Sequence, residues 1–157
     1  MTIPAVVKTV TVNAPIERAW RVFTESFNTW WPQQHHIGQA DLAEAVLEPR
    51  EGGRWYERGV DGGECDWGRV LAFEPPHRLV LSWQINGSFE YDADPAHASE
   101  IEVTFADLGG GQTRVDLEHR AFDRHGAQAQ RVHDGVGGPG GWPGIMDGYA
   151  KVAEAAD

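Results

Sequence analysis

Two polar residues of this chain lie where acid–base chemistry is conceivable. His119 continues the alternating series of Val115 and Leu117, so its imidazole is expected to point toward the interior of a sheet. Glu57 follows Trp55 by two residues, so both side chains face the same side of a strand. If that side is the inner one, His119 and Glu57 are candidate catalytic residues or anchors for a ligand. The alternative for His119 is a core histidine whose hydrogen bonds are satisfied by a neighbouring group. The alternative for Glu57 is an ordinary surface carboxylate.

Tryptophan is unusually frequent, with seven in 157 residues. An indole has a large apolar body and an N–H group that needs a partner when it is buried. Trp20 is expected in the core, because it lies on the apolar stripe of a helix. Core packing is also the alternative for the other aromatic candidates. Besides Glu57 and His119, the residues expected to line a ligand cavity are Trp55, Trp67, Trp83, Trp142 and Met146.

Other reactive side chains predict little chemistry. His35 and His36 are adjacent, and neighbouring residues rarely converge on one ion, so no metal site is expected. Cys65 has no histidine or cysteine partner at a diagnostic spacing, which disfavours a nucleophile. The glycines between 135 and 141 lack the strand–turn–helix context of a phosphate loop, so they are interpreted as a flexible lip over a cavity. No cofactor is expected.

Composition excludes further classes. The formal net charge is −11, with 24 acidic and 13 basic residues, which repels nucleic acid and anionic membranes. No stretch approaches the roughly 18 apolar residues of a membrane span, and residues 1–12 lack the pattern of a signal peptide. With one cysteine in the chain, we expect a cytoplasmic protein without nucleic-acid binding or membrane insertion.

The elements that must position these residues follow from hydrophobic periodicity. Two short helices are expected after the first strand, and the first of them carries an apolar stripe through Ile16, Trp20 and Phe23. A C-terminal helix is expected over residues 142–154, with an apolar stripe through Ile145, Met146, Tyr149 and Val152. Alternating or β-branched residues predict strands over residues 6–12, 43–48, 54–58, 65–73, 79–85, 101–105 and 113–119. This order predicts one α+β domain spanning residues 1–157, with the last helix covering the dry face of an antiparallel sheet.

Short motifs accompany this order of elements along nearly the whole chain. They include Asn13-Ala14-Pro15, Trp30-Trp31-Pro32, Gly52-Gly53-Arg54-Trp55, Trp67-Gly68-Arg69-Val70, Pro75-Pro76-His77-Arg78-Leu79 and Glu118-His119-Arg120. In this order and spacing they resemble the SRPBCC superfamily and, within it, the AHSA-type proteins, named after an activator of a heat-shock-protein ATPase. The resemblance implies a helix-grip fold, START-like and Bet v-like, in which a curved antiparallel sheet wraps around a long C-terminal helix.

The same resemblance implies a cavity between sheet and helix. The function expected is binding of a small hydrophobic or aromatic molecule, oriented by a few inward polar groups. A cyclase or hydrolase that uses the same cavity is the first alternative, and a co-chaperone-like protein-interaction domain is the second. The partners expected are a small hydrophobic molecule and, as an open alternative, a second copy of the chain in a homodimer.

Overall fold

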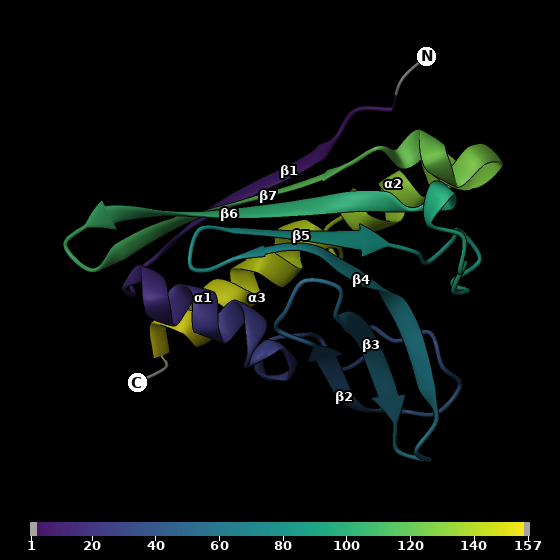
Figure 1. The fold of residues 1–157 in the computed structure, drawn as a ribbon, viewed down its shortest axis with the longest axis horizontal. Helices are drawn as coiled ribbons and strands as arrows, with labels where there is room; N and C mark the ends of the chain where they lie inside the picture. The colour runs from purple at the N-terminus through teal and green to yellow at the C-terminus, as the bar shows by residue number, and fades with distance from the viewer. Residues whose placement is uncertain (1–2, 156–157) are drawn as a thin grey trace.

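The chain folds around a seven-stranded antiparallel sheet in a computed structural model that describes residues 3–155 (Figure 1). The strands lie in the order β1-β7-β6-β5-β4-β3-β2, so the first and seventh strands pair and every other neighbour is a hairpin partner. The strands are β1 (Val6–Val12), β2 (Leu42–Leu47), β3 (Arg54–Gly59), β4 (Glu64–Glu74), β5 (Arg78–Trp83), β6 (Ser99–Gly109) and β7 (Gln112–Arg120). The predicted α+β helix-grip fold is confirmed.

The register of β6 and β7 fixes the inner face of the sheet. Ile101 pairs with His119 and Val103 pairs with Leu117, and all four side chains are buried. Their alternation with polar residues is the period of two that a half-buried strand requires. The predicted inward position of His119 is therefore confirmed.

The C-terminal helix α3 (Trp142–Ala155) crosses the concave face of the sheet (Figure 1). It buries Ile145, Met146 and Tyr149, and the hydroxyl of Tyr149 donates to the carbonyl of Ala19 at 2.6 Å. That carbonyl belongs to α1 (Ile16–Thr24), which precedes the 3₁₀ helix η1 (Phe27–Thr29). The predicted helix over residues 142–154 and its apolar stripe are confirmed.

A helix that the sequence did not predict lies before α3. The 3₁₀ segment η2 (Pro95–His97) lies between β5 and β6, and a further 3₁₀ segment, η3 (Phe122–Gln128), leads directly into α2 (Ala129–Gly137). The glycines indicate that residues 121–141 cannot be regular helix throughout, and this is confirmed, since a 3₁₀ segment precedes α2 and the helix ends at Gly137. Two glycines at this end permit close approaches. A Cβ at Gly137 would lie 3.1 Å from a methyl of Val6 in β1, and a Cβ at Gly141 would clash with the carbonyl oxygen of Val136.

Candidate functional site

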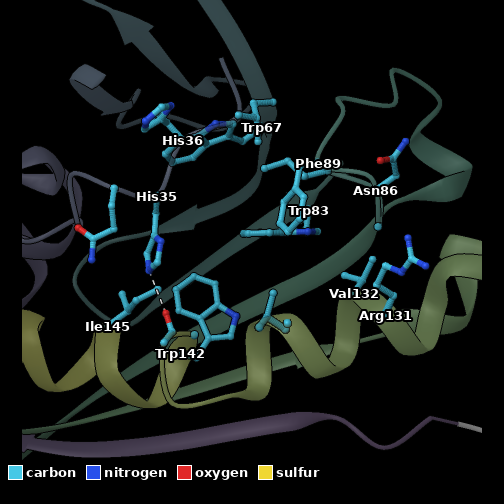
Figure 2. A pocket seen from close by; sticks show the side chains of 18 of the residues that line it. His35, His36, Trp67, Trp83, Asn86, Phe89, Arg131, Val132, Trp142 and Ile145 are labelled. Atoms are coloured by element: carbon cyan, nitrogen blue, oxygen red, sulfur yellow. Dashed lines mark hydrogen bonds between the residues drawn. The ribbon is translucent and has the colours of Figure 1, made fainter. Parts of the chain in front are cut away.

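A cavity of about 430 Å³ opens between α2, α3 and the sheet, beside the loop that follows η1 (Figure 2). Its volume lies in the range of small-molecule sites. Aliphatic side chains from α2, α3 and two loops contribute to its wall, among them Ile37, Ile85, Val132 and Ile145. The remainder of the wall is dominated by the indole rings of Trp31, Trp67, Trp83 and Trp142.

Three of the four indoles are fixed by hydrogen bonds of their N–H groups. Trp31 donates to the carbonyl of His35 at 2.8 Å, and Trp67 donates to the carboxylate of Glu57 at 2.8 Å. Trp142 donates to Nδ1 of His119 at 3.0 Å. The rings also contact one another, with 5.1 Å between the centroids of Trp31 and Trp67. The aromatic wall is thus held in place before any ligand arrives.

A β-bulge turns Trp67 toward the cavity. Trp55 pairs with Gly68 and Tyr56 pairs with Asp66, so Trp67 is the extra residue of β4. A Cβ at Gly68 would clash with the carbonyl oxygen of Ser82, to which the Trp55 indole donates at 2.8 Å. Glycine at position 68 therefore allows β4 and β5 to approach each other beside the bulge.

Glu57 is a buried carboxylate that anchors the cavity loop. Its Oε1 accepts from the backbone N–H of Ile37 at 2.5 Å and from the Trp67 indole, and its Oε2 accepts from the N–H of Gly38 at 3.0 Å. All three donors bond to the two carboxylate oxygens, which act only as acceptors in this set. Glu57 thereby joins β3, β4 and the loop at residues 37–38.

His119 forms the centre of a buried polar chain. Because the Trp142 indole can only donate, Nδ1 of His119 accepts, and Nε2–H then donates to Oγ of Ser99 at 2.8 Å. The Ser99 hydroxyl in turn donates to Nε2 of His125 at 2.7 Å. Burial lowers the pKa of His119 well below its ordinary value, and the nearby His125 and His133 lower it further. His119 is therefore a neutral imidazole whose two nitrogens are both occupied.

The structure divides the sequence-predicted ligand residues into two groups. Trp67, Trp83 and Trp142 line the cavity. The other four predicted residues, which are Trp55, Glu57, His119 and Met146, are buried behind this wall rather than in it. The two catalytic candidates, Glu57 and His119, contact different tryptophans of the wall and do not bond to each other.

Several polar cavity residues were not predicted as ligand contacts. His35 bonds through Nε2 to the carbonyl of Gly140 at 2.9 Å, and His36 bonds through Nδ1 to the carbonyl of Gly38 at 2.9 Å. Asn86 and Arg131 line the opposite end of the cavity (Figure 2). The adjacent histidines were visible in the sequence, but their place depended on the tertiary contacts that Glu57 makes with their loop.

The described residues give little support to metal or thiol chemistry. Among residues 3–155, no group of three or more histidine, cysteine, aspartate or glutamate side chains is arranged to hold a metal ion. Burial raises the pKa of the Cys65 thiol, and the nearby carboxylate of Glu57 raises it further, which disfavours the reactive thiolate. None of the described helices is long and apolar enough to cross a membrane.

The fold and the tryptophan-lined cavity define a helix-grip protein, and comparison with known families gives a closer assignment. Residues 13–151 match the family described as activator of Hsp90 ATPase homolog 1-like protein. The chain belongs to this family, as its motifs indicated. No curated protein matches the sequence.

Solved structures of the same fold include two with substantial sequence identity. The anthrahydroquino-gamma-pyrone synthase Txn09, described in a complex with SUM, is 41% identical over 96% of this chain and 97% of that chain, with a TM-score of 0.68. The self-sacrificing resistance protein CalC from Micromonospora echinospora is 34% identical over 97% of this chain and 95% of that chain, with a TM-score of 0.71. Protein MLL2253 from Mesorhizobium loti, at 24% identity and a TM-score of 0.68, shares the fold.

Proposed function

We propose that the protein binds a planar aromatic molecule in the cavity between α3 and the sheet. The observation that carries this proposal is the wall of four indoles, Trp31, Trp67, Trp83 and Trp142, around about 430 Å³ of space. A planar ring system gains apolar burial and offset or edge-on contacts with such a wall. Three indoles are already fixed by Glu57, His119 and a backbone carbonyl, so binding requires little ordering of the wall.

One relative favours the same class of ligand. Txn09 is named for an anthrahydroquinone, which is a fused aromatic system, and it covers nearly the full length of this chain. In this proposal, His119 and Glu57 act as positioning residues, because each holds one tryptophan of the wall and neither presents a free polar atom to the cavity. This changes the role considered from sequence, in which both were candidates to touch the ligand.

A pair of glycine substitutions tests the location of binding. Gly135 lines the cavity, and Gly148 in α3 does not; a Cβ at either position would have no atom within 4 Å. Gly135→Phe is therefore expected to take up cavity space, whereas Gly148→Phe is the matched control. Titration with anthraquinone-2-carboxamide, followed by tryptophan fluorescence, should give saturable quenching in the wild type and the control. Binding should weaken at least about tenfold in Gly135→Phe.

The opposite pattern would contradict the proposal. Equal binding to the wild type and Gly135→Phe would place the ligand outside this cavity. Circular dichroism and melting curves of both variants show whether either substitution disturbs the fold, so a loss of binding is interpreted only for a folded protein.

Ring-forming catalysis is a second candidate, favoured by two observations. One relative is a synthase, and two histidines line the cavity. His36 bonds Gly38 through Nδ1, which leaves Nε2 without a partner among the described residues; His35 bonds through Nε2 and likewise leaves Nδ1. An imidazole with one unpartnered nitrogen is suited to remove a proton from a bound substrate.

Product analysis separates the two candidates. Each aromatic compound that binds is incubated with wild type, His35→Gln and His36→Gln, and the mixture is examined by mass spectrometry. Recovery of the unchanged compound from all three supports binding alone. Turnover by the wild type that falls at least about a hundredfold in one variant with unchanged affinity supports catalysis by that histidine.

A protein-interaction role has less support from the surface. Among residues 3–155, the exposed large apolar side chains are divided between three strands and two loops; they are Val7, Val60, Leu71, Phe89 and Leu108. Such scattered residues are usual on a protein surface.

A further inference from the structure

Arg131 differs from most basic residues of the chain in its surroundings. Ion pairs with carboxylates occupy the basic side chains of the sheet, for example Arg78 with Glu102 and Arg120 with Glu100. Within the described residues, no carboxylate lies within ion-pair distance of Arg131. Among the described residues that line the cavity, Arg131 is the one lysine or arginine.

The stem of Arg131 is held against a neighbouring hairpin. The segment from Ile85 to Tyr91 folds back on itself, and a Cβ at Gly87 in its tip would lie 3.1 Å from Cδ of Arg131. Gln128, just before α2, secures this contact. Its Oε1 accepts from the N–H of Gly87 at 2.8 Å and its Nε2 donates to Oγ of Ser88 at 3.0 Å. Arg131 is an exposed residue whose methylene groups lie against this hairpin and whose side chain borders the cavity.

Asn86 shapes the turn at the same end of the cavity. Its Oδ1 accepts from the N–H groups of Ser88 and Glu90 at 2.9 and 3.1 Å. Figure 2 shows Asn86 and Arg131 on the same side of Trp83, with the amide of Asn86 turned away from the guanidinium group. A guanidinium group can only donate, so Arg131 makes this end of the cavity complementary to an acceptor that carries negative charge.

The mouth beside Arg131 is aromatic. Phe89 lines the cavity with 72% of its side chain exposed, and its φ of 59° lies in the left-handed region that a bulky residue rarely adopts. The backbone hydrogen bond from Phe89 to the carbonyl of Asn86, at 3.0 Å, keeps the tip in this conformation. An aromatic side chain held at the mouth is placed to cover a ring whose polar substituent reaches Arg131.

We propose that the cavity selects aromatic ligands that carry an acidic group, a carboxylate or an ionised phenol or enol, which Arg131 binds. This inference rests on the proposed function and adds the class of ligand. The net charge of −11 repels an anionic ligand over most of the surface, so an unpaired cation at the cavity supplies the local attraction that an acidic ligand needs.

Two probes of equal shape test the proposal, anthraquinone-2-carboxylate and anthraquinone-2-carboxamide. The wild type should bind the carboxylate about tenfold more tightly, and that preference should decline as salt is raised from 50 to about 500 mM. Arg131→Gln should abolish the preference, because the carboxylate loses an ion pair whereas the carboxamide loses only contact with the side chain. Arg131→Lys should retain part of it, since the charge remains but the planar pair of donors is lost.

Arg21→Gln is the matched control. Arg21 is an exposed arginine in the last turn of α1, outside the cavity, so its loss changes the net charge equally. This variant should keep the preference of the wild type. Equal affinity of the wild type for both probes, or an equal loss in Arg21→Gln and Arg131→Gln, would overturn the role of Arg131 while leaving aromatic binding intact. No binding of either probe would contradict the proposed function itself.

Discussion

Replacing Glu57 with glutamine tests how the cavity wall is held. Glutamine has nearly the same shape, but one of its terminal atoms becomes an NH₂ donor. All three partners of Glu57 are donors, namely the N–H groups of Ile37 and Gly38 and the indole of Trp67. Whichever way the amide turns, at least one N–H faces another donor and loses its acceptor.

The size of the effect follows from these contacts. A hydrogen bond to a charged group contributes about 1.5–3 kcal/mol, and a buried donor without a partner costs about 1–3 kcal/mol. The two energies are not additive, because the value of the hydrogen bond already includes part of the desolvation cost of the unpaired donor. Glu57 is 1% exposed, so water cannot replace the lost acceptor. We therefore expect Glu57→Gln to reduce the free energy of unfolding by about 2–4 kcal/mol.

Urea unfolding monitored by tryptophan fluorescence measures this loss, with Glu64→Gln as the control. Glu64 is a partly exposed carboxylate on β4 that pairs with Arg54, and its replacement should change stability by less than about 0.5 kcal/mol. Amide hydrogen exchange should also accelerate at Ile37 and Gly38 in Glu57→Gln. A loss below about 1 kcal/mol with unchanged exchange would refute the conclusion that Glu57 secures this loop.

Two further predictions concern the core and the buried histidine. Trp20→Ala should reduce the free energy of unfolding by about 3–5 kcal/mol, because its buried indole packs edge-on against Phe73 and Phe105; a loss under about 1 kcal/mol in denaturant would contradict that. Because burial lowers the pKa of His119 below its ordinary 6.5, the unfolded chain gains a proton below that pH that the folded chain does not. Stability should fall as the pH drops below about 6.5, by about 1.4 kcal/mol per pH unit from this group. His119→Gln should show a shallower fall in pH-dependent urea unfolding, and parallel curves would refute the assignment.

Local sequence patterns were sufficient to predict the buried face of an element wherever that face is uniformly apolar. The alternation of Val115, Leu117 and His119 correctly predicted the inner face of β7, and the stripe of Ile145 and Met146 predicted the buried face of α3. In both cases the side-chain period of the element decides burial, and no long-range contact is needed to read it.

The cavity wall depended on contacts that a local pattern does not contain. Trp55 on β3 and Trp67 on β4 are both buried, but only Trp67 lines the cavity. Trp67 is the extra residue of the bulge in β4. The facing of Trp67 follows from the insertion of one residue in β4, which period-two reading cannot anticipate. Arg131 was missed because α2 was not predicted, and its place at the cavity depends on the packing of Gly87 against it.

The most direct test of aromatic binding is an NMR titration of the indole N–H resonances. Saturation with anthraquinone-2-carboxamide should shift the signals of the cavity residues Trp31, Trp67, Trp83 and Trp142 most strongly. The indole of Trp30, which donates to the carbonyl of Val22 away from the cavity, should move least. Shifts confined to Trp20 or Trp30, or no shift of any cavity indole at saturating ligand, would contradict the assignment of this cavity as an aromatic binding site.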